Sequence, residues 1–263
     1  MTDKQKIKVG DGCTVAYRFD GPEDAPVLLL SNSLGTDMDM WAPQMSLWSQ
    51  HFRVLRYDSR GHGASDSPAG AYSIARLGYD VVELLDALGL GALHFCGLSL
   101  GGMVGQWLAV HAPERIKRLV LANTSCYMGP PSNWQARIER VLADGMAPLA
   151  EASIARWFTP AFAERNPQIV APIRDMLLAT NAAGYAGCCA AIRDMDHRPI
   201  VALIRTPTLV IAGKADPATP VRDAMNLYEK VQNGSIAKLE AAHLSNVEDA
   251  DNFERTVRIF LSA

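Results

Sequence analysis

The sequence lacks the marks of several large protein classes. It has only five cysteines among 263 residues, an odd number, and their spacing matches no Cys/His metal pattern. No apolar run is long enough to cross a bilayer, and the first eight residues carry charge without the apolar core of a signal peptide. We therefore expect no disulfide framework, no bound metal and no membrane association, and we expect a cytoplasmic protein with reduced thiols.

An excess of charge of one sign is also missing. The 25 Lys and Arg residues and 28 Asp and Glu residues give a formal net charge of -3, and no basic block stands out. Nucleic-acid binding would need clustered positive charge, so nucleic acid is not an expected partner. Hydrophobic residues make up 49% of the chain, which at this length suffices for one large core. The composition leaves a homo-oligomer open.

Short apolar runs that end in turn residues recur along the chain, a pattern typical of buried parallel strands. An apolar pair of segments, Ile7–Val9 and Thr14–Phe19, flanks Asp11-Gly12 and predicts a β-hairpin before them. The predicted strands are Val27–Leu30, Arg53–Tyr57, Leu93–Cys96, Leu119–Ala122, Thr208–Ile211 and Ser235–Leu239.

Helical patterns separate these strands. Apolar residues from Ile74 to Leu88 share one helix face, with Ser73 as N-cap. Thr219-Pro220 is expected to open a helix, with Thr219 as the cap and Pro220 at the first position, and Asn246 to Leu261 is expected to form another. The alternation predicts an α/β fold with a mostly parallel central sheet flanked by helices.

The stretch 125–198 interrupts this alternation. It contains helical pieces such as Trp134–Leu142 and Ala152–Trp157 but no convincing strand. We interpret it as an inserted helical cap. Residues 1–124 and 199–263 then form the core domain.

The strongest chemical signal is Gly97-Leu98-Ser99-Leu100-Gly101, which follows a predicted strand and precedes a predicted helix. This is the context that a G-x-S-x-G nucleophile elbow requires. Glycines allow the sharp turn, and the hydroxyl then stands at the carboxyl edge of the sheet, where ligands bind in open α/β folds. Ser99 is the candidate nucleophile.

A serine hydroxyl needs a base to remove its proton. Of six histidines, His243 alone follows both Ser99 and a suitable acid, in the chain order Ser…Asp…His of this fold. Asp216 is that acid, because it lies just beyond the strand Thr208–Ile211 and can orient the imidazole and stabilise its cation.

Acyl transfer also needs two N–H donors for the oxyanion. The residue after the nucleophile supplies one, so Leu100 is a candidate; Leu34, in the loop after the strand Val27–Leu30, is the other. Asn32 in the same loop either braces it or forms an Asx-turn, and the sequence does not separate these roles.

Four segments of the chain are distinctive: Ser31 to Thr36, Arg56 to Ser65, Gly97 to Met103 and Gly184 to Asp194. They resemble the 3-oxoadipate enol-lactonases of the α/β-hydrolase superfamily, and the similarity extends through nearly the whole chain. The elbow marks only the superfamily, whereas the loop after the first parallel strand and the cap segment are more specific. Ser59 stands where threonine is expected.

The resemblance implies a serine hydrolase that opens 3-oxoadipate enol-lactone to 3-oxoadipate, through an acyl-enzyme and without a cofactor. It places the triad on Ser99, Asp216 and His243. The substrate is a small anionic lactone, and Arg137 and Arg193 of the cap are candidates for binding its carboxylate, with Trp134 as a pocket wall. Surface or core positions in the cap explain these three residues equally well.

Other functions stay open at this point. A carboxylesterase, a cofactor-free perhydrolase or a carbon–carbon bond hydrolase would keep the same triad. A hydrolase-like ligand receptor is disfavoured because no catalytic residue type is missing from the sequence. A dehalogenase would carry aspartate at the elbow.

Overall fold

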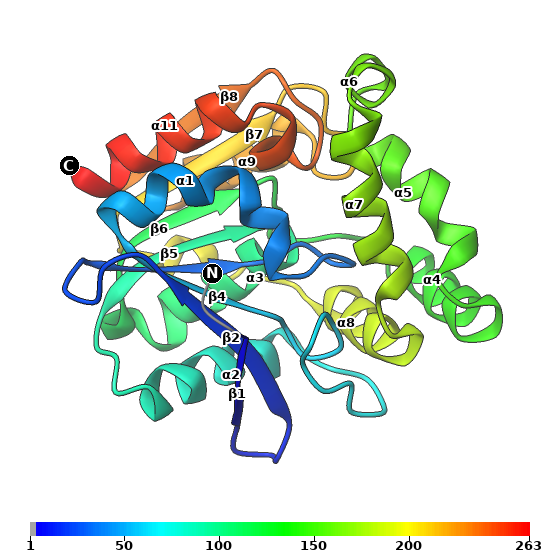
Figure 1. The fold of residues 1–263 in the computed structure, drawn as a ribbon, viewed down its shortest axis with the longest axis horizontal. Coiled ribbons are helices and arrows are strands. Elements are labelled where there is room, and N and C mark those ends of the chain that lie inside the picture. Colours follow the sequence, from blue (N-terminus) through cyan, green and yellow to red (C-terminus); the bar gives the residue numbers. More distant parts are fainter. Residues whose placement is uncertain (1–3) are drawn as a thin grey trace.

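The computed structural model describes residues 4–263, and its centre is one eight-stranded sheet of order β1-β2-β4-β3-β5-β6-β7-β8 (Figure 1). β1 and β2 are antiparallel to their neighbours, and the remaining strands are parallel. The strands are β1 (Gln5–Lys8), β2 (Thr14–Asp20), β3 (Val27–Ser31), β4 (Arg53–Tyr57), β5 (Leu93–Leu98), β6 (Ile116–Ala122), β7 (Thr208–Gly213) and β8 (Gly234–Leu239).

The strand order reverses between β3 and β5. β3 is followed in the chain by β4 on one side, whereas β5 and all later strands lie on the other side. Loops that leave the carboxyl ends of the two strands diverge there and open a crevice, which is where open α/β sheets bind ligands. The predicted nucleophile and the predicted oxyanion loop follow these two strands.

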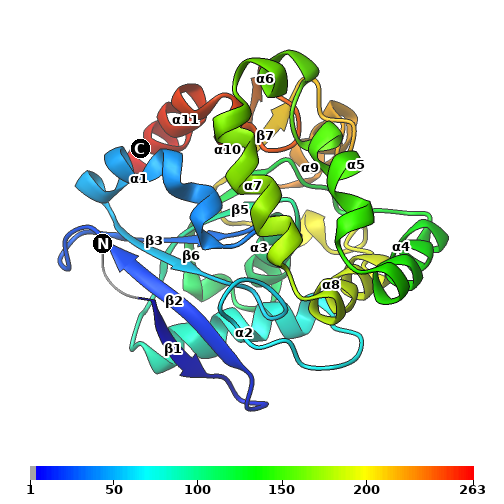
Figure 2. The same cartoon turned by 45° about the vertical axis from the view of Figure 1, so that its right-hand side comes forward.

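Helices cover both faces of the sheet (Figures 1 and 2). On one face α1 (Ala42–His51) packs against α11 (Ala250–Ser262) through Trp41, Trp48 and Phe253, whose ring centroids are 6.1 to 6.2 Å apart. On the other face lie α2 (Ile74–Ala87) and α3 (Leu100–His111), and α9 (Val221–Lys230) packs on β7 and β8.

Five helices are inserted between β6 and β7. They lie side by side over one end of the sheet (Figure 2), and α4 and α8 have the most extensive contact among them. A β-bridge between Tyr127 and Asp196 joins the two ends of the insertion. The helices are α4 (Pro131–Asp144), α5 (Ala150–Trp157), α6 (Pro160–Arg165), α7 (Pro167–Ala179) and α8 (Ala182–Asp194).

The predicted strands and hairpin are confirmed. Each predicted strand lies within an observed one, and the largest difference is at β6, which begins three residues earlier, at Ile116. Ser73 caps α2 as expected, since its side chain accepts from the Arg76 N–H. The α/β fold with a mostly parallel sheet and an inserted helical region is therefore confirmed.

Two helix predictions are wrong in detail. The stretch from Asn246 to Leu261 is not one helix, because Asp249 takes non-helical angles and separates α10 (Ser245–Glu248) from α11. Thr219 does not cap α9, because its hydroxyl donates to Asp216, and the helix begins after Pro220.

Among the described residues, 4–263, no helix is long and apolar enough to cross a membrane.

Packing between α2 and α3 depends on a residue without a side chain. A Cβ added at Gly78 would lie 2.0 Å from Cε3 of Trp107. We expect Gly78→Ala to lower the free energy of unfolding by about 1 to 3 kcal/mol, because the ring has to move in a packed core. Urea titration of wild type and variant measures the difference.

Gly91 supplies the matched control. A Cβ there meets no atom within 4 Å, so Gly91→Ala should change stability by less than about 1 kcal/mol. Equal stability of the two alanine variants would contradict the packing argument.

Candidate active site

Ser99 occupies the turn between β5 and α3 with strained backbone angles, φ 56° and ψ −112°. Residues other than glycine rarely have positive φ, and such strain persists only where the surroundings fix it. The Ser99 N–H donates to Ala122 O at 2.9 Å, and its carbonyl accepts from Thr124 Oγ1 at 2.8 Å. These bonds hold the turn, and the side chain faces a cavity at the carboxyl edge of the sheet.

Glycines beside Ser99 are required by close approach. A Cβ at Gly101 would lie 2.1 Å from Ser31 O, and one at Gly97 would lie 2.2 Å from Gly101 O. The chain therefore turns this sharply only because these positions have no side chains.

His243 and Asp216 are joined by a hydrogen bond of 2.8 Å between Nδ1 and Oδ2. Both side chains are buried, and His243 lines the same cavity as Ser99. With Nδ1 held by the carboxylate, Nε2 is the nitrogen left to take a proton from the serine. The structure thus brings together the three predicted triad residues from β5, β7 and β8.

The Asp216 carboxylate is surrounded by donors. Its Oδ1 accepts from the N–H groups of Ala218 and Thr219, at 2.8 and 3.0 Å, and its Oδ2 accepts from Thr219 Oγ1 at 2.7 Å. Burial by itself would raise the pKa of Asp216, but His243 and the hydrogen bonds outweigh it and hold the pKa below its usual value. The group is therefore ionised at neutral pH, as an acid that steadies an imidazolium must be.

Asn123 is a site residue that the sequence reasoning missed. It follows β6 with φ 44°, and its amide donates to Asp216 Oδ2 at 3.0 Å and to Ala242 O at 3.2 Å. Its oxygen accepts from Ser245 Oγ at 2.5 Å. Asn123 thus fixes the acid and the segment that carries His243. Its place at the end of a predicted strand was the available signal.

The loop after β3 carries the predicted oxyanion donor Leu34, which lines the cavity beside Ser99. Asn32 braces this loop: its amide donates to Tyr57 O at 2.8 Å and its oxygen accepts from Trp41 Nε1 at 2.9 Å. Leu100 is the first residue of α3, where N–H groups have no partner within the helix. The two residues predicted to supply the oxyanion donors therefore lie in the cavity beside Ser99 and directly after it in the chain.

Two of the three predicted substrate residues line the cavity. Trp134 and Arg137 both extend from α4, and the Arg137 guanidinium lies 4.9 Å from the centroid of the Trp134 ring. Arg193 lies elsewhere: it does not line this cavity, and its guanidinium is bonded to Asp194 at 2.7 Å and to Gln135 at 2.6 Å.

Arg156 of α5 lines the cavity and was not predicted. Burial, and then the nearby charge of Arg137, lower its pKa. The positive charges of Arg137 and Arg156 repel each other in this cavity. An anion bound between them would therefore be stabilised by both. The helical pattern of Ala152–Trp157 predicted the helix, but it did not show which face meets the site.

Comparison with known proteins agrees with this geometry. Residues 26–250 match the model of the family described as "alpha/beta hydrolase fold", and the chain belongs to that family. It is 44% identical over 92% of its length to 3-oxoadipate enol-lactonase 2 of Acinetobacter baylyi, covering 90% of that protein. Within the family, the chain is therefore a homologue of the 3-oxoadipate enol-lactonases.

Solved structures lead to the same group. The enol-lactonase from Burkholderia xenovorans LB400 superposes with a TM-score of 0.97 at 43% identity, covering 98% of this chain and 100% of the other. A hydrolase from Pseudomonas aeruginosa superposes with a TM-score of 0.97 at 50% identity and 99% coverage of both chains. The resemblance stated from the sequence is confirmed.

Replacing the acid tests its assigned role. Asp216→Asn should lower kcat for p-nitrophenyl acetate by about 10⁴-fold, because an amide stabilises the wrong imidazole tautomer and no longer balances the imidazolium. Steady-state kinetics measure the change. Asp223→Asn, at the start of α9 and outside the cavity lining, should retain activity; an equal loss in both variants would contradict the assignment.

Proposed function

We propose that this protein is a serine hydrolase that opens 3-oxoadipate enol-lactone to 3-oxoadipate, a step in the β-ketoadipate pathway of aromatic compound catabolism. The observation that carries the proposal is that His243, hydrogen-bonded to Asp216, lines one cavity with Ser99 at its strained turn. The enol-lactonase relatives over nearly the full chain support the substrate.

Acylation begins when His243 Nε2 takes the Ser99 proton and Oγ attacks the lactone carbonyl. Negative charge develops on the carbonyl oxygen, and the Leu34 and Leu100 N–H groups stabilise it. Asp216 stabilises the imidazolium that forms. These donors are in place before reaction, so little reorganisation accompanies the developing charge.

Collapse of the tetrahedral intermediate breaks the ring C–O bond. The leaving group is an enolate, a better leaving group than an alkoxide, and it stays attached to the acyl chain because the substrate is cyclic. The His243 imidazolium returns its proton to the enolate, which becomes the ketone. His243 then activates a water that cleaves the acyl-enzyme and releases 3-oxoadipate with free Ser99. The residues named supply every proton transfer, so this mechanism uses no cofactor.

The substrate's free carboxylate is assigned to Arg137 and Arg156. Both line the cavity from the inserted helices, and Trp134 lines it with them. Arg193 is left out of this assignment because Asp194 and Gln135 occupy its guanidinium. The pair favours an anionic substrate over the neutral esters of a general carboxylesterase.

The triad and the carboxylate site are assigned to different parts of the chain. We assign the triad to a core domain of residues 1–124 and 199–263, of which residues 1–3 lie outside the described residues, and the carboxylate site to a cap of residues 125–198. The five cysteines are all free and buried, which supports the assignment to a reducing compartment, the cytoplasm.

One assay decides the proposal. Loss of enol-lactone absorbance should be rapid with wild type, and Ser99→Ala should slow it by about 10⁴-fold or more, because the acyl-enzyme no longer forms. Rapid hydrolysis of p-nitrophenyl acetate with no action on the lactone would defeat the proposed substrate while sparing the triad.

The carboxylate site has its own test. Arg156→Met should raise KM for the enol-lactone by about tenfold or more, since a charge-assisted bond to the substrate is lost, and should leave hydrolysis of neutral p-nitrophenyl acetate within about twofold. Arg193→Met is the matched control and should leave KM unchanged. A larger effect of Arg193→Met would contradict the assignment.

A further inference from the structure

The loop after β4 holds the oxyanion loop at two points. His62 Nε2 accepts from the Gly35 N–H at 2.9 Å, and Asp58 Oδ1 accepts from the Met38 N–H at 2.7 Å. Gly35 directly follows Leu34, the donor from this loop. The first of these bonds therefore fixes the planar peptide unit between Leu34 and Gly35, and the unit that carries the Leu34 N–H is joined to it through the Leu34 Cα.

His62 has one proton state in this arrangement. Because Nε2 accepts from an N–H, the ring proton is on Nδ1, which points towards Arg60 O at 3.4 Å and Cys188 Sγ at 3.9 Å. The ring is 2% exposed, and burial lowers the pKa of His62 to about 4, so the neutral acceptor form persists at the pH of a cell.

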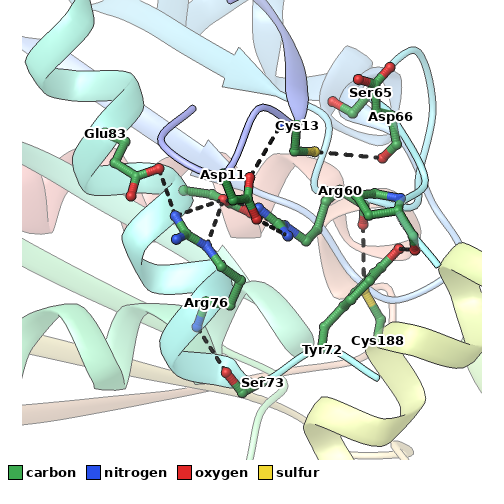
Figure 3. Close-up of polar contacts among 12 residues, drawn as sticks. Asp11, Cys13, Arg60, Ser65, Asp66, Tyr72, Ser73, Arg76, Glu83 and Cys188 are labelled. Carbon is green, nitrogen blue, oxygen red and sulfur yellow. Dashed lines mark hydrogen bonds and ion pairs between the residues drawn. The ribbon is translucent and has the colours of Figure 1, made fainter. Parts of the chain in front are cut away.

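The loop that carries His62 is itself rigidly anchored. Arg60 forms a two-pronged ion pair with Asp80 of α2, at 2.5 and 2.6 Å, and reaches Asp11 of the hairpin at 2.8 Å. Figure 3 shows Arg60 directed at Asp11, with its carbonyl facing the Cys188 sulfur. A buried, bidentate pair of this kind holds the backbone of residues 60–62 in place.

The same loop contacts the inserted helix α8. A Cβ at Gly61 would lie 2.7 Å from Gly184 Cα, so the two backbones touch. The His62 ring lies 6.5 Å from the ring of Tyr185, which lines the cavity. His62 therefore stands between the inserted helices and the oxyanion loop, without being among the residues that line the cavity.

We propose that His62 is a positioning residue of the oxyanion hole, in which its Nε2 accepts the Gly35 N–H and so directs the Leu34 N–H at the reacting carbonyl oxygen. A buried N–H without an acceptor turns towards another partner, and here that turn would rotate the donor beside it. The proposal rests on the proposed function, since only attack by Ser99 generates an oxyanion.

The test removes the acceptor and keeps the bulk. His62→Leu should lower kcat for the enol-lactone and for p-nitrophenyl acetate by about 10- to 100-fold, the range expected for a misdirected donor. Affinity for a boronic acid that forms a tetrahedral adduct on Ser99 should fall by a similar factor. KM and the Kd of 3-oxoadipate should stay within about twofold, because ground-state contacts are kept.

Two amides separate acceptor position from packing. His62→Gln extends far enough to bring an oxygen near the place of Nε2 and should recover most of kcat, whereas the shorter His62→Asn should not. Cys188→Ala removes a contact on the opposite side of the ring and should leave kcat within about twofold. Thermal unfolding of each variant checks that it is folded.

The proposal is overturned if folded His62→Leu keeps kcat within twofold of wild type, or if KM and product affinity change as much as kcat. If His62→Leu does not fold, equal kcat for the glutamine and asparagine variants overturns it instead. If the wild type cleaves p-nitrophenyl acetate through Ser99 but leaves the lactone intact, the proposed function fails. The kcat of His62→Leu for the ester then still tests the positioning role of His62.

Discussion

The strained turn at Ser99 is the constraint on which the site depends. A serine with φ 56° is unfavourable by itself, by about 1 to 3 kcal/mol, and it persists because β5 and α3 leave no other path between them. Gly101 lets the chain pass within contact distance of Ser31, and Gly97 lets it pass within contact distance of Gly101. Relaxing that turn would displace the Ser99 hydroxyl and the Leu100 N–H together, because the two residues are adjacent in the chain. In the proposed function these groups are the nucleophile and one oxyanion donor, so a single backbone conformation positions both.

Whether a buried group in the site is charged depends on the hydrogen-bond partners around it. Asp216 is buried, yet its oxygens receive hydrogen bonds from Thr219, Ala218, Asn123 and His243, so its charge is retained. His62 is also buried, but it is neutral. No carboxylate faces its nitrogens in the contacts described, and it acts as an acceptor. The imidazoles of His243 and His62 therefore take different roles, because a carboxylate faces a nitrogen of His243 whereas a backbone N–H faces Nε2 of His62.

The parts of this arrangement that depend on neighbouring residues in the chain could be predicted from the sequence. Strand ends were predictable since apolar runs stop where turn residues begin, and Ser99, Asp216 and His243 follow such ends in the order of the fold. Asn123 also follows a strand, but nothing near it in sequence shows that it reaches Asp216, which is 93 residues away. The break at Asp249 was missed because apolar periodicity continues on both sides of it.

The inserted helices were the least predictable part for a physical reason. Periodicity identifies a helix and its buried face, but it does not say whether that face meets the core or a cavity. Arg156 lies in a helix that the sequence pattern predicted, and Arg193 lies in the cap segment that the resemblance identified. Only the packing of α4 against α8 and of α5 against α7 decides that Arg156 lines the cavity with Ser99 and that Arg193 bonds to Gln135.

The inserted helices are joined to the sheet close to the site. The chain leaves β6 at Ala122, and Asn123, which fixes Asp216, is the next residue. Ser125 then accepts through its carbonyl from Gln106 of α3, so the first residues of the insertion are tied to the core beside the nucleophile. The insertion also reaches the segment that carries His243. The Leu244 N–H donates to Trp157 O at 3.0 Å, and the Thr159 N–H donates to Glu248, which in turn accepts from the Ala242 N–H. In the proposed function, the acyl chemistry is therefore assigned to residues at the carboxyl ends of the strands, and recognition of the substrate's charge is assigned to the inserted helices.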